Sequence, residues 1–367
     1  MREVYFDNAS TALPVYRLKL EDYGNPSAIH SLGVRADTVL TESRRLFSKI
    51  LNTAPNEIIF TSGGTESNNL AIIGYALAHR RNTTCFIALP WVHPSITHSI
   101  KHIAALNFGK EIYADSVEDV ILNIKPTGTH FICLPQICHE TGDIYDIEKM
   151  SFEIKKINPS SIIFVDGAQG FCKESIDIGN IDLYSFSSHK IHGPCGVGGL
   201  YIKKGIRLAP LAAGGNQEMG LRSGTPNVQG ISEFAASAEK LNNNKFESHK
   251  SVCAIKYELL KLTSDLNDVY VNSLLGHTSP YILNMSFCGI KGEVLVNGLS
   301  SEGIYASTGA ACNVNKKGNA SLINMGISKS RAESAVRFSF SHANTVDEAV
   351  YARKKICEIV TALRKFS

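Results

Sequence analysis

The sequence predicts an α/β protein with a large, mostly parallel sheet flanked by helices and a smaller α+β domain. Apolar strands alternate with segments of helical length, at about 57–61, 85–89, 130–134, 162–166, 182–186 and 197–203. After Thr225-Pro-Asn the pattern changes to a helical stretch from about 228 to 265, interrupted at Asn242, and the chain closes with a helix from about 345 to 366. A chain of 367 residues with 44% hydrophobic content is long enough to bury one large core and a second, smaller one.

The first of these strands runs into a glycine turn and the start of a helix, Ser62-Gly-Gly-Thr-Glu-Ser-Asn68. Free backbone N–H groups at such a helix N-terminus, next to Gly64 and the hydroxyl of Thr65, favour a phosphate dianion. A glycine turn alone is a weak signal, so its meaning depends on the motifs that follow it.

The β-branched segment Ser160-Ser-Ile-Ile-Phe-Val-Asp166 is typical of a buried parallel strand that ends in a carboxylate. The carboxyl end of such a strand faces a ligand crevice in open α/β sheets. Asp166 is therefore placed to pair with a protonated pyridine nitrogen, which makes the ring an electron sink.

The next strand leads into Ser187-Ser-His189-Lys190-Ile-His-Gly193. A lone lysine is most often a solvated surface charge. Here a phosphate turn and a strand-end carboxylate precede Lys190 in chain order, and a lysine amine can hold an aldehyde cofactor as a Schiff base. Together the three motifs predict a pyridoxal 5'-phosphate site.

Nine widely spaced cysteines without a Cys-x-x-Cys pair argue against a disulfide framework and against a zinc site, so no metal is expected. Most are expected to be small buried side chains, of which Cys133 is typical. Cys312 differs, because the polar run Asn313-Val-Asn-Lys-Lys-Gly that follows it offers a structural cysteine little to pack against. We predict that Cys312 is a functional thiol.

Composition excludes other classes. The net charge is +3 and no segment concentrates Lys and Arg, so nucleic acid is not an expected partner. No run reaches the roughly 18 apolar residues of a membrane span, and folded sequence begins at once, so we expect a cytoplasmic protein without a signal peptide.

Arg337 lies in the apolar segment Ala335-Val-Arg-Phe-Ser-Phe340, where an unpaired guanidinium would be costly to bury. Its planar fork fits a substrate α-carboxylate. The alternative is an internal salt bridge. His93 has a similar pair of interpretations, as a hydrogen-bonded core residue or as part of the site.

The whole set of motifs resembles the NifS/IscS-like cysteine desulfurases of the class V aminotransferase group, which have the pyridoxal-phosphate-dependent fold type I. The resemblance covers nearly the whole chain. Its motifs include Tyr5-Phe-Asp-Asn8, Gly24-Asn-Pro-Ser, Val92-His-Pro-Ser, Glu140-Thr-Gly, Val165-Asp-Gly-Ala-Gln169, Gly214-Gly-Asn-Gln-Glu218, Arg222-Ser-Gly-Thr-Pro-Asn227, Ser307-Thr-Gly-Ala-Ala-Cys312 and Val336-Arg-Phe-Ser.

The resemblance implies a large cofactor-binding domain at 13–234 and a small domain at 1–12 and 235–367 that carries the Cys312 loop and Arg337. It implies that His93 stacks on the pyridine and takes part in catalysis, and that Gln169 hydrogen-bonds the phenolic oxygen. It implies phosphate ligation by Ser187, by His189 and, from the other subunit of a homodimer with shared active sites, by Thr225. Asn8 would line the substrate end of the site.

Two features depart from the family. His139 in Cys138-His-Glu-Thr-Gly142 replaces the asparagine that normally holds the phenolic oxygen, which could retune the cofactor because imidazole titrates near neutral pH. The connection between Asp7 and Gly24 is also shorter than usual, near the expected entrance of the active site.

The activity implied is conversion of L-cysteine to L-alanine, with a persulfide on Cys312 for transfer to a protein sulfur acceptor such as a cluster scaffold or a thiolation protein. Three alternatives stay open: a selenocysteine lyase, another class V aminotransferase and a non-catalytic scaffold. An aminotransferase would share Lys190 and Asp166 but would not need a thiol at 312.

Overall fold

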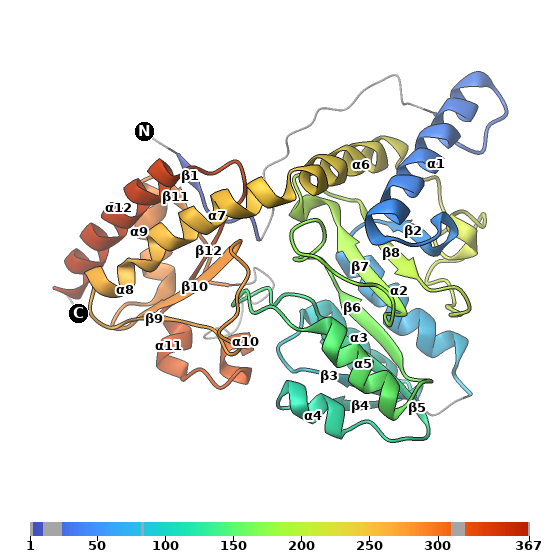
Figure 1. Cartoon of the computed structure of the whole chain (residues 1–367), viewed down its shortest axis with the longest axis horizontal. Coiled ribbons are helices and arrows are strands. Elements are labelled where there is room, and N and C mark those ends of the chain that lie inside the picture. The colour runs from blue at the N-terminus through green and yellow to red at the C-terminus, as the bar shows by residue number, and fades with distance from the viewer. Residues whose placement is uncertain (1–2, 10–23, 82–83, 310–319, 366–367) are drawn as a thin grey trace. The chain divides into compact units, whose positions relative to one another are not determined.

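The computed structural model describes residues 3–9, 24–81, 84–309 and 320–365. These residues form two compact units. Unit 1 comprises Met1–Ala12, Ile137–Ile144 and Asn244–Ser367, and unit 2 comprises Leu13–Gln136 and Tyr145–Asn243 (Figure 1). That the range 13–234 binds the cofactor, while 1–12 and 235–367 form a small domain that carries the Cys312 loop and Arg337, stays a prediction.

A seven-stranded sheet in the order β2-β8-β7-β6-β5-β3-β4 forms the centre of unit 2. Strand β8 is antiparallel to both of its neighbours, and the other pairs are parallel. The strands are β2 (Ile58–Thr61), β3 (Thr84–Ala88), β4 (Lys110–Tyr113), β5 (Thr129–Pro135), β6 (Ile162–Asp166), β7 (Leu183–Ser187) and β8 (Gly198–Ile202). The predicted α/β class with a mostly parallel sheet is thus confirmed.

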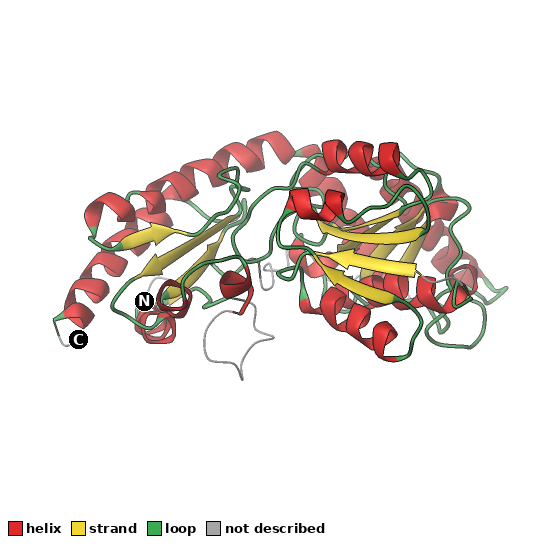
Figure 2. Cartoon of the chain, turned by 90° about the horizontal axis from the view of Figure 1, so that it is seen from below, coloured by secondary structure: helices red, strands yellow, loops and turns green. Residues whose placement is uncertain are grey.

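Helices lie on both sides of this sheet (Figure 2). They are α1 (Ser31–Leu51), α2 (Gly64–Ala78), α3 (Pro94–Ala105), α4 (Val117–Leu122), α5 (Ile147–Ile157) and α6 (Val228–Asn243). The carboxyl ends of β2, β4 and β5 lead into the helices α2, α4 and α5, whereas β6 is followed by a loop to β7 and β7 by the short turn Ser188–Lys190 before β8.

An aromatic cluster anchors the loops that follow β6 and β7. Phe171 stacks on Phe186 with ring centroids 4.6 Å apart, and Phe47 of α1 packs against Phe234 of α6 at 4.6 Å. Each such pair contributes about 0.5–1.5 kcal/mol beyond its buried area. The cluster fixes the backbone immediately before Ser187 and shortly after Asp166.

Unit 1 contains two small sheets and a helical layer. Strands β9 (Val269–Val271), β10 (Ile282–Phe287) and β12 (Ala335–Ser339) are antiparallel with β10 in the centre, while β1 (Val4–Tyr5) pairs in parallel with β11 (Ile304–Tyr305). The helices are α7 (Lys245–Leu260), α8 (Leu262–Asp265), α9 (Gly292–Ser301), α10 (Ala320–Asn324), α11 (Lys329–Glu333) and α12 (Val346–Arg364).

The core of unit 1 joins residues from both ends of the chain. Val4 and Phe6 are buried with Ile304, Phe338 and helix α12. The segment Ile137–Ile144, inserted between two parts of unit 2, packs with Ala9 and Ile282. Unit 1 is therefore assembled from three separate stretches of sequence.

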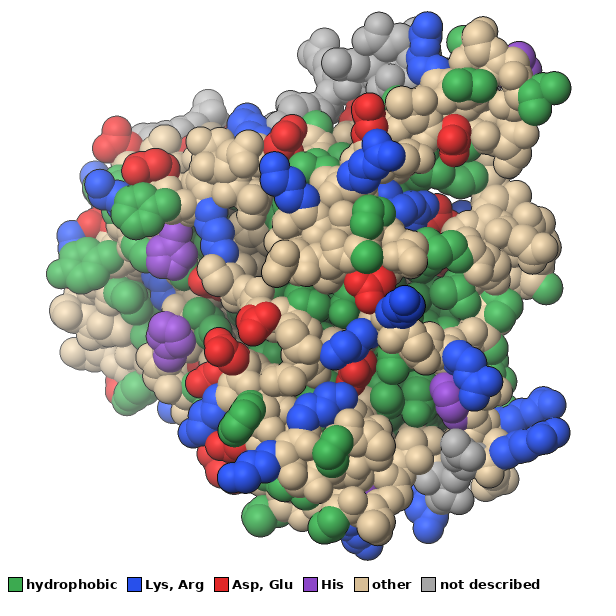
Figure 3. Space-filling view, turned by 45° about the vertical axis from the view of Figure 1, so that its right-hand side comes forward, with side chains coloured by type: hydrophobic (Ala, Val, Ile, Leu, Met, Phe, Trp, Pro, Cys, Tyr) green, Lys and Arg blue, Asp and Glu red, His purple; other side chains and the backbone are tan. Residues whose placement is uncertain are grey.

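The predicted helical break near Asn242 lies at Asn244, between α6 and α7. Acidic and basic side chains are interspersed on the face shown in Figure 3, in keeping with the small net charge. Within the described ranges, every helix is too short or too polar to cross a membrane.

Candidate functional site

The turn between β2 and α2 has the features expected of an anion-binding site. Gly63 has φ +152°, a conformation that side chains rarely adopt, and it makes no side-chain cap for α2. A Cβ atom built on Gly64 would lie 3.6 Å from the Cβ of Ser187, so the helix N-terminus and the end of β7 are neighbours. The Ser187 hydroxyl oxygen is buried and has no hydrogen-bond partner among the described residues.

A positive electrostatic environment surrounds the residues that follow Ser187. Burial, followed by the charges of Lys190 and Lys173, lowers the pKa of His189 to about 4. Burial also lowers the pKa of Lys173 to about 8. A phosphate dianion would offset the charges of Lys190 and Lys173 and would accept the hydrogen bond that the Ser187 hydroxyl can donate.

Asp166 ends β6 and is held by two hydrogen bonds. Its Oδ1 accepts from the backbone N–H of Ala168 at 3.0 Å, and its Oδ2 accepts from Asn68 Nδ2 at 3.0 Å. The next residue, Gly167, has no room for a side chain, because a Cβ atom there would lie 2.0 Å from the Tyr184 ring. The carboxylate is therefore fixed in orientation at the carboxyl end of the sheet.

His93 caps the N-terminus of α3 and connects to the same network. Its Nδ1 lies 2.7 Å from Ser95 Oγ and accepts from the Ser95 backbone N–H at 3.2 Å. Ser95 Oγ in turn accepts from Asn68 Nδ2 at 2.8 Å. His93 and Asp166, far apart in sequence, are thus joined through two side chains.

The other predicted cofactor residues of unit 2 have different exposures. Gln169 is buried, whereas Thr65 is exposed in the first turn of α2 and Thr225 is exposed in the loop before α6. Arg222 forms an ion pair with Glu66, 3.2 Å between Nε and Oε1, and so supports the first turn of α2.

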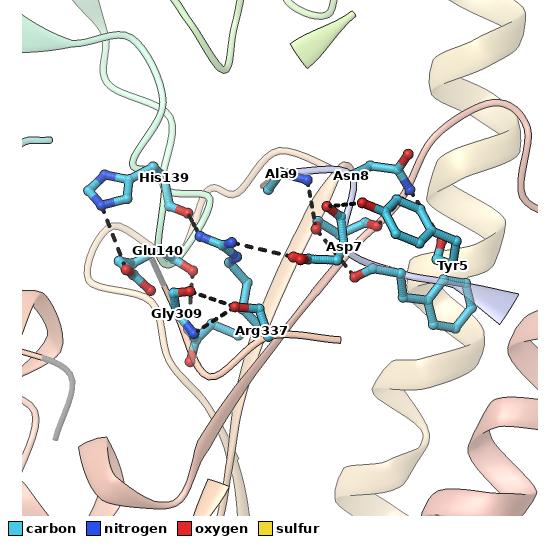
Figure 4. A network of polar contacts seen from close by, with 12 residues as sticks. Tyr5, Asp7, Asn8, Ala9, His139, Glu140, Gly309 and Arg337 are labelled. Atoms are coloured by element: carbon cyan, nitrogen blue, oxygen red, sulfur yellow. Dashed lines mark hydrogen bonds and ion pairs between the residues drawn. The ribbon is translucent and has the colours of Figure 1, made fainter. Parts of the chain in front are cut away.

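Unit 1 places Arg337 in a network of polar contacts (Figure 4). Its side chain is 2% exposed, Nη1 donates to the His139 carbonyl at 2.8 Å, and Nη2 lies 3.6 Å from Asp7 Oδ1. An internal ion pair, one of the two interpretations of the sequence, is therefore present. At 3.6 Å, this contact with Asp7 is longer than a hydrogen bond.

Asn8 and His139 lie in this network too. Asn8 Nδ2 donates to the carbonyls of Tyr5 and Ser339, which orients its buried Oδ1; that oxygen has no hydrogen-bond partner among the described residues. His139 Nε2 is 3.6 Å from Oε1 of the fully buried Glu140.

Cys312 lies outside the described residues, as does most of the short connection between Asp7 and Gly24. The described segment before Cys312 is anchored, because Ser307 and Arg337 exchange backbone hydrogen bonds. The cysteines that the structure describes are free thiols, and Cys133 is fully buried as predicted, which raises the pKa of its thiol.

Three residues of the unit 2 site were not predicted from the sequence: Asn68, Ser95 and Lys173. Helical spacing offered a signal for Asn68, since it lies four residues after Gly64 and hence on the same face of α2. Ser95 and Lys173 carried no comparable signal, because a serine in a first helical turn and a lysine after a loop are most often solvated.

The geometry of unit 2 fits pyridoxal phosphate. A buried hydroxyl at Ser187, a helix N-terminus and a positive environment suit the phosphate, a fixed carboxylate at Asp166 suits the pyridinium, and Lys190 follows in the same loop as Ser187.

Comparisons with known proteins agree with this chemistry. The family described as aminotransferase class-V matches residues 4–351. The chain is 37% identical to a "NifS/IcsS protein homolog" of Lactobacillus delbrueckii subsp. bulgaricus, over 94% of each chain. It is 33% identical to a "Cysteine desulfurase IscS" of Buchnera aphidicola subsp. Schizaphis graminum, over 99% of this chain and 94% of that protein. A solved "NIFS-LIKE PROTEIN" superposes with a TM-score of 0.91 at 31% identity, over 98% of this chain and 100% of that one.

Proposed function

The chain belongs to the class-V aminotransferase family, and we propose from this premise that it converts L-cysteine to L-alanine and keeps the sulfur as a persulfide on Cys312. Relatives named cysteine desulfurases match it over nearly their full length, so it is a cysteine desulfurase of the NifS/IscS-like kind. Family membership also makes it an enzyme that depends on pyridoxal phosphate.

The observation that carries the assignment of the site is the group of residues around the end of β7 and the start of α2. Ser187, His189 and the N-terminus of α2 would hold the phosphate, with Gly64 and Thr65 at the helix start. Asp166 would pair with the pyridinium, Gln169 and His139 would bind the phenolic oxygen, and Lys190 would hold the aldehyde.

When bound, the cofactor supplies an electron sink that stabilises negative charge on the substrate carbon. The residues of the chain do the remaining work. Lys190 Nζ holds and returns the proton of the substrate α-carbon. His93 would lie over the ring, and Asp166 keeps the charge that favours a protonated ring nitrogen.

The sulfur step belongs to Cys312. Its thiolate attacks the sulfur of L-cysteine, an S–S bond forms, and the C–S bond breaks with its electron pair left on carbon. That carbon takes up a proton, so the products are alanine and a cysteine persulfide, and no external oxidant or reductant is needed. The persulfide is then available to a protein sulfur acceptor.

Arg337 and Asn8 would bind the substrate. The guanidinium of Arg337 is buried and its contact with Asp7 is long, so a second carboxylate can share its charge. The buried Oδ1 of Asn8 is an acceptor suited to an ammonium or amine group. The cytoplasm, where thiols stay reduced, suits an enzyme that works through a free cysteine.

We also assign Thr225 to the other subunit of a homodimer. Its exposed position before α6 leaves the hydroxyl accessible to a partner's phosphate. Each active site would then need residues from both chains.

The test is to incubate the purified protein with L-cysteine and a thiol reductant and to measure alanine and sulfide. Cys312→Ser is expected to reduce sulfur release by orders of magnitude while the cofactor absorbance persists. Cys253→Ser, which alters an exposed thiol on α7, is the matched control and should keep full activity. Undiminished desulfuration by Cys312→Ser would overturn the assignment.

A further inference from the structure

We propose that Asn68 and Ser95 are positioning residues that hold His93 as a neutral ring with its proton on Nε2. The inference rests on the proposed function only where it places His93 over the cofactor. The hydrogen bonds themselves connect described residues of unit 2 and form a chain that begins at Asp166.

The first link fixes the orientation of the Asn68 amide. Asn68 is 2% exposed, and its Nδ2 lies 3.0 Å from Asp166 Oδ2. A carboxylate accepts only, so the amide must direct its NH2 group at Asp166 and not its oxygen. The amide oxygen then accepts from Ser185 Oγ at 2.6 Å, which satisfies the other end of the group.

The second link fixes the direction of the Ser95 hydroxyl. The second hydrogen of Asn68 Nδ2 points to Ser95 Oγ, 2.8 Å away. An amide nitrogen cannot accept, so Ser95 Oγ is the acceptor and its own proton must be donated elsewhere. His93 Nδ1, at 2.7 Å, is the acceptor in reach.

The third link fixes the tautomer of His93. Nδ1 faces the Ser95 hydroxyl and also the Ser95 backbone N–H at 3.2 Å. The backbone N–H is a donor in every state of the protein, so a proton on Nδ1 would face it donor to donor. The ring therefore carries its proton on Nε2, and the single lone pair of Nδ1 faces both donors.

The network therefore determines both the charge of His93 and the side of its ring that can donate a hydrogen bond. A neutral ring adds no positive charge beside the cofactor, and its single N–H is kept at the nitrogen opposite the helix cap. The charge of Asp166, which the cofactor ring nitrogen requires, thereby also sets which nitrogen of His93 is the donor.

The experiment is nitrogen NMR of the full-length protein labelled in histidine, with and without pyridoxal phosphate, at a pH near 8. His93→Gln identifies the signals of His93. We expect an unprotonated, hydrogen-bonded Nδ1 and a protonated Nε2. In Ser95→Ala the population with a proton on Nδ1 should increase about two- to tenfold, the factor that one neutral hydrogen bond contributes.

Ser99→Ala is the matched control. The Ser99 hydroxyl lies one turn later on α3, within hydrogen-bond distance of the Ser95 carbonyl (2.7 Å) and Asn69 Oδ1 (3.0 Å), so its loss should leave the His93 signals unchanged. Ser95→Thr keeps the hydroxyl and should restore the wild-type signals.

A proton on Nδ1 in the wild type would overturn the proposal, and so would equal effects of Ser95→Ala and Ser99→Ala. Because the signals are measured without turnover, they are independent of desulfuration. Loss of desulfurase activity with an intact tautomer would count against the proposed function alone.

Discussion

Replacing Arg337 by methionine separates its two interpretations, because a substrate clamp and an internal ion pair predict different losses. In the free protein the change removes a charge-assisted hydrogen bond to the His139 carbonyl and a long ion pair with Asp7. The first is worth about 1.5–3 kcal/mol. The second is worth about 0–1 kcal/mol, because Asp7 is partly solvated. The free energy of unfolding should therefore fall by roughly 2–4 kcal/mol.

The clamp adds a loss that only the substrate reveals. Two charge-assisted hydrogen bonds to the α-carboxylate at about 1.5–3 kcal/mol each give roughly 3–6 kcal/mol, or two to four powers of ten in kcat/KM. L-Cysteinamide lacks the carboxylate charge. Wild-type enzyme should therefore prefer L-cysteine over the amide by about that factor, and Arg337→Met should lose the preference.

Steady-state kinetics with both substrates and urea unfolding of the free protein measure the two effects. Arg353→Met is the control, because Arg353 is also in unit 1 and pairs with Glu258 and Asp265. It should lower stability without changing the preference. If Arg337→Met lowers stability but keeps the preference for L-cysteine, the guanidinium serves only the internal pair and the clamp is refuted.

Two further predictions concern the cofactor loop and the dimer. The pKa of His189 is about 4 in the folded protein and about 6.5 when unfolded, so between these values only the unfolded chain binds the proton. The free energy of unfolding of the cofactor-free protein should therefore fall as pH drops from 6.5 to 4, by at most about 1.4 kcal/mol per pH unit. Urea titrations of His189→Asn should show a shallower slope, and parallel slopes would contradict this. Mixing Lys190→Ala with an impaired Thr225→Ala protein should raise activity above the mean of the two parents once subunits exchange, because one site of each heterodimer carries neither defect. No rise, with exchange confirmed by mass, would show that Thr225 serves its own subunit.

The strands that carry site residues could be predicted because they are central, with apolar β-branched runs that end in Asp166 or lead into Ser187. The edge strand β4 was not predicted: Lys110 and Glu111 are exposed, so the apolar pattern that marks the buried strands is absent.

The partners of the site residues were harder to predict than the residues themselves. Asp7 meets Arg337 because the N-terminal segment pairs with β11 and β12, a long-range arrangement that no local pattern marks. Asn68 contacts Asp166 because Gly64 starts α2 beside β7, and the closeness of the two elements appears only in the folded sheet.

The discontinuity of unit 1 has a consequence for the order in which the protein folds during synthesis. Val4 pairs with Ile304, and Phe6 packs on Phe340, so the ribosome must have made nearly the whole chain before these N-terminal residues are buried. All of unit 2, 13–136 with 145–243, emerges earlier and can fold first. Until β11 and β12 appear, the apolar N-terminal segment and the inserted segment 137–144 stay without their native neighbours. A nascent chain stalled after residue 243 should therefore expose both segments to chaperones and proteases, although its mostly parallel sheet is already complete.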